Sequence, residues 1–245
     1  MLTEPIIKQT PRVTVIVPNY NHQRYLVQRI DSILAQSYQD FEIILLDDAS
    51  KDGSANLLRS YQNHPKVQRV LVNEVNTGSP FKQWNKGLEF ARGEYVWIAE
   101  SDDYAEPEFL QTLTSKLDAN QGAGIAYCLS HKVDADSKKF GSTTDWTEYL
   151  GSDRWRADYY STGAEECTKY MIFRCIIPNV SCVVFRRQAL KDAGYADGSM
   201  SYCGDYSTYV RVMKNSGVVY IAQQDRKSTR LNSSHPRLSR MPSSA

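Results

Sequence analysis

Hydrophobic runs alternate with amphipathic segments along the first part of the chain. Two runs rich in β-branched residues, Arg12–Val17 and Phe41–Leu46, are typical of buried strands. Between them, apolar residues recur every three or four positions over Gln23–Gln36, which predicts a helix with one core-facing side. A strand, a helix and a strand in this order predict a parallel βαβ unit.

The same alternation continues toward the carboxyl end. Further strands are expected at Val67–Val72, Tyr95–Ala99, Gly124–Leu129, Asn179–Phe185 and Val218–Ala222. Further helices are expected at Ser54–Tyr61, Pro80–Ala91, Asp205–Lys214 and in a segment with Pro107 in its first turn. This pattern predicts an α/β fold with a doubly wound, mostly parallel central sheet and helices on both faces. Such sheets bind ligands at the carboxyl ends of their strands, so the loops after the first, second and fourth strands are candidates.

Composition and charge narrow the classes of partner. With 41% hydrophobic residues among 245, the chain is able to bury a full core, and its formal net charge of +1 gives no reason to expect a nucleic-acid partner. The five cysteines and four histidines show no ligand spacing, so neither zinc nor a disulfide framework is expected. No apolar run approaches a membrane span and no signal peptide is evident, which predicts a cytoplasmic protein.

Polar residues follow the first two strands. Pro18-Asn19-Tyr20-Asn21 ends one strand and Asp47-Asp48-Ala49-Ser50 ends the next, so the two turns should lie side by side. A carboxylate there is able to accept a hydrogen bond from a nucleobase, and an aromatic ring is able to stack on its face. Alternatively, Asp48 and Ser50 only form turns or cap helices.

An acidic run, Glu100-Ser101-Asp102-Asp103, directly follows the strand at Tyr95–Ala99. Paired carboxylates are able to bind Mg²⁺ or Mn²⁺, and such a cation is able to neutralise the charge on the phosphate oxygens of a ligand. Three acidic groups in four residues repel one another without a cation. The alternative is a purely structural run at the end of a strand.

A third candidate is Asp205, which follows Gly204 at the start of a predicted amphipathic helix. It is placed to cap that helix.

Three segments together resemble the family 2 glycosyltransferases of the GT-A fold: IVPNYN, SILAQSYQDFEIILLDDASKDGS and GEYVWIAESDD. The resemblance extends from about Arg12 to Gln224 and implies a Rossmann-like GT-A catalytic domain. It also implies inverting transfer of a hexosyl or N-acetylhexosaminyl group from a nucleoside diphosphate sugar, with UDP favoured. The acceptor would be a hydroxyl of a glycan or lipid-linked molecule in polysaccharide or cell-envelope biosynthesis, and the cofactor Mg²⁺ or Mn²⁺.

The resemblance also assigns roles to residues. It implies that Pro18, Tyr20 and Asp48 bind the nucleotide, with Asp48 accepting from a uracil-like N3–H and Asp47 as the second choice. Asp103 is then the direct metal ligand, and Asp102 contacts the ribose or the metal. By the same resemblance, Asp205 takes the proton from the acceptor hydroxyl.

The chain departs from the family pattern after Asn76. Relatives carry N-x-G followed by an Arg-Asn pair, whereas here Trp84 precedes Asn85 and the spacing is one residue longer. Lys82 is the candidate for the missing positive charge, or it is simply a solvated lysine. Lys82 and Asn85 are therefore weaker candidates for nucleotide-sugar binding.

A polar segment rich in aromatic residues, Lys132–Gly163, is predicted to be a long excursion over the site. Trp146 and Trp155 either stack on acceptor sugar rings or anchor this loop on the core. Arg186, in a segment that resembles the family's acceptor-side FRR, either faces the acceptor or begins a solvated helix.

The last segment, Asp225–Ala245, has no period and is rich in Ser, Arg and Pro, which predicts disorder. Codons for Asp225–His235 and Ser239–Ala245 can also spell the two ends of a common sequencing adapter. We therefore expect a catalytic domain over residues 1–224, truncated at its carboxyl end, and a non-native tail over 225–245. Peripheral association with the inner face of a membrane would then depend on the missing part.

Two other classes are less compatible with the motifs. A nucleotidyltransferase would show a Gly-rich, basic loop after the first strand, where this chain has PNYN, and a dinucleotide oxidoreductase would show GxGxxG there. A nucleotide-sugar-binding module without turnover remains the non-enzyme alternative.

Overall fold

A computed structural model describes residues 10–134, 136–151, 153–222 and 229–232. The strands are β1 (Val13–Asn19), β2 (Phe41–Asp47), β3 (Val67–Val72), β4 (Tyr95–Ile98), β5 (Tyr104–Ala105), β6 (Ala123–Cys128), β7 (Ser130–Val133), β8 (Lys139–Ser142), β9 (Tyr159–Thr162), β10 (Val183–Arg186), β11 (Gly217–Ile221) and β12 (Thr229–Asn232). The α-helices are α1 (Gln23–Leu34), α2 (Ser54–Ser60), α3 (Pro80–Leu88), α4 (Phe109–Ala119), α5 (Thr144–Thr147), α6 (Gly163–Glu166), α7 (Arg187–Asp192) and α8 (Gly204–Met213). Short 3-10 or π turns lie at Glu148–Leu150, Asp153–Arg156, Cys167–Met171 and Val180–Cys182.

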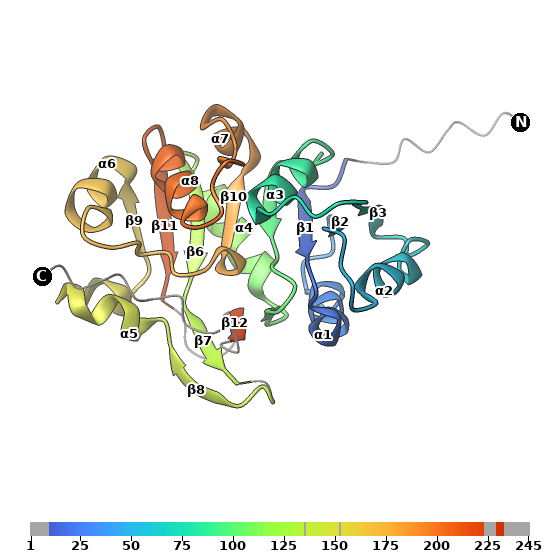
Figure 1. Ribbon diagram of the computed structural model, residues 1–245. Helices are drawn as coiled ribbons and strands as arrows, with labels where there is room; N and C mark the ends of the chain where they lie inside the picture. The colour runs from blue at the N-terminus through green and yellow to red at the C-terminus, as the bar shows by residue number, and fades with distance from the viewer. Residues whose placement is uncertain (1–9, 135, 152, 223–228, 233–245) are drawn as a thin grey trace, which may run out of the picture.

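The main sheet has eight strands in the order β3-β2-β1-β4-β10-β6-β11-β9 (Figure 1). Strands β3, β2, β1 and β4 pair in parallel, as do β6 and β11. Strand β10 runs antiparallel between β4 and β6, and β9 is antiparallel at the edge. The predicted α/β fold with a mostly parallel sheet is confirmed. The reversed direction of β10 brings its first residues, rather than its last, to the carboxyl edge of the parallel strands.

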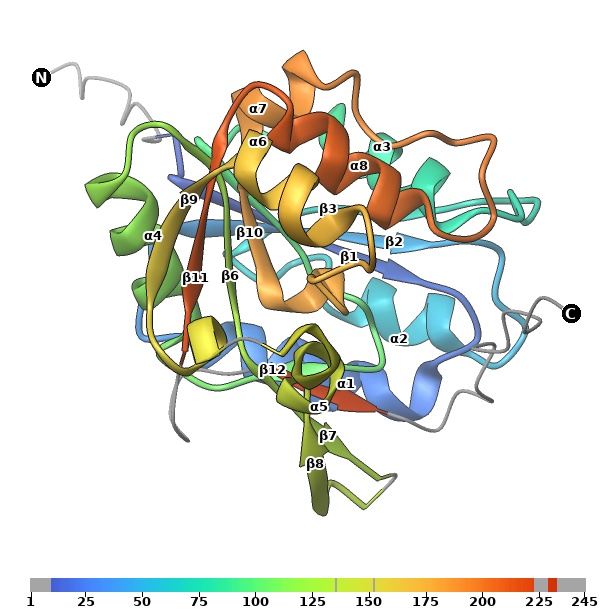
Figure 2. The ribbon, with the colours of Figure 1, turned by 90° about the vertical axis from the view of Figure 1, so that its left-hand side faces the viewer.

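The register between β1 and β4 decides which helices cover each face of the sheet. Val15 pairs with Trp97, so these two side chains share one face and Ile16 points to the other. The Trp97 ring lies 4.7 Å from that of Phe109 in α4 and 4.9 Å from the guanidinium carbon of Arg29 in α1. Helices α1 and α4 therefore cover the face of Trp97 (Figures 1 and 2).

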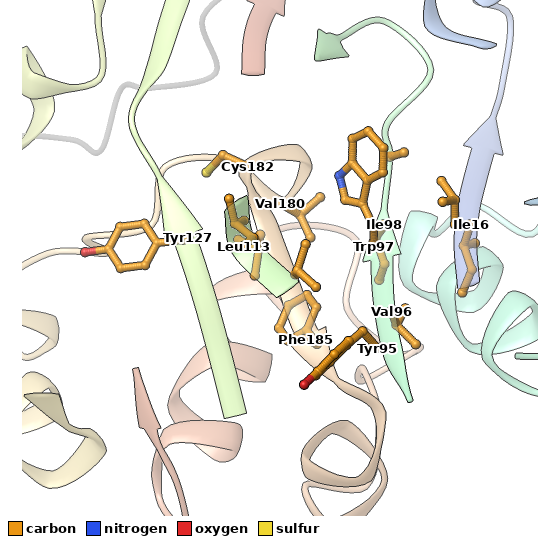
Figure 3. Packing of buried hydrophobic residues seen from close by; sticks show 14 of the residues in the cluster. Ile16, Tyr95, Val96, Trp97, Ile98, Leu113, Tyr127, Val180, Cys182 and Phe185 are labelled. Atoms are coloured by element: carbon orange, nitrogen blue, oxygen red, sulfur yellow. The ribbon is translucent and has the colours of Figure 1, made fainter. Parts of the chain in front are cut away.

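The opposite face carries α3 and α8. Gly87 of α3 packs directly on Ile16, and the ring of Phe185 in β10 stacks on Tyr209 of α8, with centroids 6.1 Å apart. All seven residues of β1 and of β2 are buried because helices cover both faces, which explains their continuous apolar runs. The buried side chains of the central strands pack closely (Figure 3), and each large one stabilises the fold by about 1.5–3 kcal/mol.

A smaller sheet, ordered β5-β12-β7-β8, lies below the main one in Figure 1. Strands β8 and β9 and helix α5 fall in the segment predicted to be an excursion of weak periodicity. Strand β12 falls in the tail predicted to be disordered, where it pairs with β5 and β7. Without β12, one side of β7 would be an edge with unpaired N–H and C=O groups, and such an edge accepts another strand with little regard to its sequence. The rest of 223–245 lies outside the described residues.

Among the described residues, no helix is both long enough and apolar enough to cross a bilayer.

We expect Gly87→Ala to destabilise the fold by about 1–3 kcal/mol, although alanine normally favours a helix over glycine. The added Cβ would lie 2.5 Å from Cγ2 of Ile16, which is fully buried. Urea unfolding measures the loss. Ile16→Ala removes the overlapping atoms, so the double variant should lose less stability than the two single losses combined. Simple additivity would contradict this close contact between α3 and β1.

Candidate functional site

A cavity of about 520 Å³ opens at the carboxyl edge of the parallel strands. The loops after β1, β2 and β4, the start of α3 and the loop before α8 form its wall. Its lining residues are Pro18, Asn19, Tyr20, His22, Asp48, Asn76, Gly78, Ser79, Pro80, Gln83, Glu100, Ser101 and Tyr202. The structure thus brings together Pro18, Tyr20 and Asp48 with the first half of the acidic run, as the topology predicted.

Asp47 joins the loops after β1 and β2. Its carboxylate accepts from Asn19 Nδ2 at 2.8 Å and from the Ser50 amide at 2.9 Å. The Ser50 hydroxyl in turn accepts from the amide of Asn21 at 2.8 Å. Since Asp47 is fully buried and both of its oxygens are engaged, it positions the two loops and does not itself line the cavity.

Asp48 lines the cavity, but its carboxylate already accepts several hydrogen bonds. Asn73 Nδ2 donates at 2.6 Å, Thr77 Oγ1 at 2.8 Å and Gln83 Nε2 at 2.9 Å, and the amide of Thr77 adds a further contact. These bonds hold the loop after β3 against α3. The structure therefore shows Asp48 as an organiser of the cavity wall, and a nucleobase N–H would have to compete for its remaining lone pair.

Two further side chains, Tyr20 and Gln83, line the cavity together with Asp48. Tyr20 is 45% exposed, so its ring is available to a ligand. Gln83 was missed at the sequence level; its Oε1 is buried and has no hydrogen-bond partner within the described residues. The sequence did contain a signal for Gln83, which stands between Phe81 and Trp84 on the apolar side of α3. A buried amide normally has a hydrogen-bond partner, so a glutamine at such a position indicates a polar contact.

Lys82 and Asn85 do not line this cavity. Lys82 Nζ donates to the carbonyl of Thr77 at 3.2 Å. The Asn85 amide donates to the Ala196 carbonyl at 2.8 Å and accepts from the Ala196 amide at 3.0 Å. Both polar atoms of Asn85 are thus used to tie α3 to the segment before α8.

The acidic run forms a turn after β4 in which Asp103 is buried and Glu100 and Asp102 are partly buried. Trp84 Nε1 donates to Glu100 Oε1 at 2.9 Å, and the Glu100 amide donates to Ser181 Oγ at 3.0 Å. Burial, followed by the charge of Asp102, raises the pKa of Glu100 to about 8. The same two causes raise the pKa of Asp103 to about 6, against a hydrogen bond of 2.8 Å from Asn179 Nδ2.

Asn179 and Ser181 reach this turn because β10 is antiparallel, so its amino-terminal approach lies at the carboxyl edge of β4. Neither was predicted as a site residue. His22 was missed as well; it lines the cavity, and its Nδ1 lies 3.0 Å from Ser101 Oγ. A single sequence offers no signal for these residues, since their partners are 76 to 81 positions away.

The oxygen-rich turn fits a hard divalent cation of the Mg²⁺ or Mn²⁺ type. In the described part of the chain, no three His, Cys, Asp or Glu side chains are arranged to hold a metal by themselves. Such cations normally take one or two carboxylates and complete their shell with phosphate oxygens and water. The raised pKa values of Glu100 and Asp103 show that negative charge is held here at a cost, which a cation would relieve.

Asp205 occupies the first turn of α8, just after the cavity-lining Tyr202. Figure 2 shows α8 beginning on the side toward which β1 and β2 point. The first residue of α8, Gly204, packs closely against the Phe81 ring, and a Cβ at this position would lie 2.5 Å from that ring. Burial raises the pKa of Asp205, so its carboxylate is a stronger base than an ordinary aspartate.

Two of the three residues predicted on the acceptor side, Trp155 and Arg186, are not among the described residues that line this cavity. Arg186 lies opposite Tyr95, the first residue of β4, and pairs with Glu94 at 3.0 Å. It therefore sits at the amino edge of the parallel strands, because β10 runs the other way, and does not line the cavity. Trp155 is buried, and its Nε1 donates to the Tyr127 hydroxyl at 3.2 Å, so it anchors the loop. The side chain of Trp146 lies outside the described part.

Comparisons with known proteins show what this chain is similar to in sequence. The model of the family described as glycosyl transferase family 2 matches residues 14–192. Glycosyltransferase GlyG of Streptococcus pneumoniae is 40% identical over 101 residues, which is 41% of this chain and 33% of GlyG. An uncharacterized glycosyltransferase of Nostoc, alr2836, is 26% identical over 220 residues, covering 85% of this chain and 64% of that protein.

Solved structures share the fold. Staphylococcus aureus TarS 1–349 in complex with UDP superposes with a TM-score of 0.71 at 20% identity, covering 90% of this chain and 60% of that one. The mannosyltransferase PcManGT from Pyrobaculum calidifontis, in complex with GDP-Man and Mn²⁺, gives 0.65 at 22% identity, covering 95% and 59%. At these identities, the likeness establishes the GT-A fold alone.

We expect Asp48→Ala to lower the free energy of unfolding by about 2–4 kcal/mol, because the buried donor of Gln83 and the partly buried donors of Asn73 and Thr77 lose their acceptor. Urea unfolding gives the value. Asp197→Ala, at an exposed loop position, is the matched control and should change stability by less than about 0.5 kcal/mol. Equal losses in the two variants would contradict the organising role of Asp48.

Without divalent cations, stability should fall as pH rises from about 4.5 toward 8 through the contribution of Glu100. The folded protein binds this proton more tightly than the unfolded chain does, and the folded state therefore loses its advantage as the pH passes through this window. Urea unfolding in EDTA, compared between wild type and Glu100→Gln, isolates that contribution. The difference should change by at most about 1.4 kcal/mol per pH unit. A difference that is constant across the window would show that the Glu100 pKa is not raised.

Proposed function

This chain belongs to glycosyl transferase family 2, and we propose that it carries the donor-binding and catalytic site of an enzyme that transfers a sugar from a nucleoside diphosphate sugar to an acceptor hydroxyl. The supporting observation is the single cavity edge where Tyr20 and Asp48, the acidic turn and the loop leading to Asp205 converge. The acceptor class we propose is a glycan or lipid-linked molecule, and the reaction inverts the anomeric centre.

The cavity suits the nucleotide part of such a donor. Its volume of about 520 Å³ lies in the range of small-molecule sites. The exposed ring of Tyr20 is able to stack on the base, and Asp48 and Gln83 line the same cavity. A uridine donor is favoured, which is supported by the TarS structures in complex with UDP and UDP-GlcNAc, although PcManGT was solved with GDP-Man.

Asp103 and Asp102 would hold the divalent cation. Asn179 donates to Asp103 Oδ2 and so fixes the direction of its carboxylate, while Asp102 is the less buried of the two. When bound, Mg²⁺ or Mn²⁺ supplies positive charge to the leaving diphosphate. The protein's part is to hold these oxygens at the end of β4, directly beside the cavity residues Glu100 and Ser101.

Asp205 would act as the general base. An inverting transfer needs one base on the face of the sugar opposite the leaving group, to take the proton from the attacking hydroxyl. Burial raises the pKa of Asp205, which makes proton removal from an alcohol more favourable than it is for a solvated aspartate. Its place in the first turn of α8 holds the carboxylate on a rigid element.

Calorimetric titration with UDP and Mn²⁺, paired with UDP release from a panel of UDP-sugars and acceptors, tests the proposal. Asp103→Asn should weaken Mn²⁺-dependent UDP binding by about tenfold or more, because a charged ligand is lost. Asp205→Asn should bind UDP normally and slow transfer by about 10²–10⁴-fold.

Asp192→Asn is the matched control, since this carboxylate lies at the end of α7 and accepts from Gln188. It should leave both measurements unchanged. UDP binding that ignores Asp103→Asn would remove the metal assignment. Binding without transfer from any donor would favour a nucleotide-sugar-binding module instead.

A further inference from the structure

Behind the acidic turn, α1 places an arginine that the sequence motifs did not single out. Arg29 is fully buried, and its Nε donates to the carbonyl oxygen of Glu100 at 2.8 Å. Its guanidinium carbon lies 4.9 Å from the centroid of the Trp97 ring. These two contacts fix the charged group between the sheet and the turn.

The two terminal nitrogens of Arg29, Nη1 and Nη2, are buried and have no hydrogen-bond partner within the described residues. Burying a cation in this way costs several kcal/mol unless nearby negative charge compensates it. The charges that act favourably on Arg29 are those of Asp103, Asp102 and Glu100, the three acidic residues of the turn.

Arg29 keeps its charge despite this burial. Desolvation lowers its pKa to about 10, while the three carboxylates act in the opposite direction. The side chain is therefore protonated at neutral pH. Because it is anchored at Nε and stacked on Trp97, it cannot leave the turn to meet a ligand in the cavity.

We propose that Arg29 is a positioning residue whose fixed positive charge holds the carboxylates of Asp102 and Asp103 together when no divalent cation is bound. The turn is then already formed when the cation and the diphosphate arrive. This inference deepens the proposed function, on which the metal-binding role of the turn rests.

Three substitutions separate the charge from the hydrogen bond. Arg29→Lys keeps the charge, Arg29→Gln keeps a donor for the Glu100 carbonyl without the charge, and Arg29→Met keeps neither. Melting temperatures are measured at neutral pH in EDTA and in excess Mn²⁺. In EDTA, the Gln and Met variants should melt about 4 °C or more below wild type, and the Lys variant should lie close to wild type. Mn²⁺ should raise the melting temperature more in the two neutral variants than in wild type.

A double variant guards against simple misfolding. Asp102→Asn removes one of the repelling carboxylates, so it should restore most of the stability that Arg29→Gln loses in EDTA. Asp192→Asn, far from the turn, should restore none.

Three results would overturn the proposal: Arg29→Gln melting with wild type, Arg29→Met melting above wild type in EDTA, or no recovery on adding Asp102→Asn. If Arg29→Gln melts with wild type, the hydrogen bond to the Glu100 carbonyl, and not the charge of Arg29, stabilises the turn. If Arg29→Met melts above wild type, the cost of desolvating Arg29 exceeds the stabilisation that its charge provides. If wild type does not respond to Mn²⁺, the proposed metal use fails, while the EDTA measurements still decide the role of Arg29.

Discussion

The parallel pairing of β1 with both β2 and β4 is the constraint on which the rest of the molecule depends. These strands are covered on both faces, so each backbone group has to pair within the sheet, and the register is fixed by side chains that fit both helix layers. Asn19 pairs with Asp47 and Ile16 pairs with Ile98, so the loops after β1, β2 and β4 all begin at one edge of the sheet. The cavity exists because three buried strands end together.

Hydrogen bonds between polar side chains hold the cavity wall together. Asp47 and Asp48 have adjacent positions but different tasks, since one joins the loops after β1 and β2 and the other holds the loop after β3 against α3. Both carboxylates therefore stabilise the loops around the cavity, and Asp48 also lines it. The acidic turn after β4 holds negative charge where water solvates it poorly. The positive charge of Arg29 offsets part of this negative charge. In the proposed reaction, a divalent cation offsets more of it.

Much of this arrangement was predictable from the chain alone. The strand–helix alternation, the parallel start and the position of the acidic run after β4 all follow from local patterns, and strand β3 was predicted with its observed bounds. Predictions failed where direction or partner mattered. The position of Arg186 at the amino edge was not foreseen, because nothing local shows that β10 runs antiparallel. The strands in 132–163 were missed because edge strands carry little apolar alternation.

The sequence by itself thus determined which segments form the buried strands and helices, and which acidic residues stand at the strand ends, because burial imposes a periodicity on nearby residues. Only the tertiary structure decided that Asp48 is surrounded by donors, that Gln83, Asn179 and His22 belong to the site, and that Arg29 lies beneath the turn. The physical reason is that hydrogen bonding and charge pairing act over a few ångströms of space, between residues that are tens of positions apart along the chain.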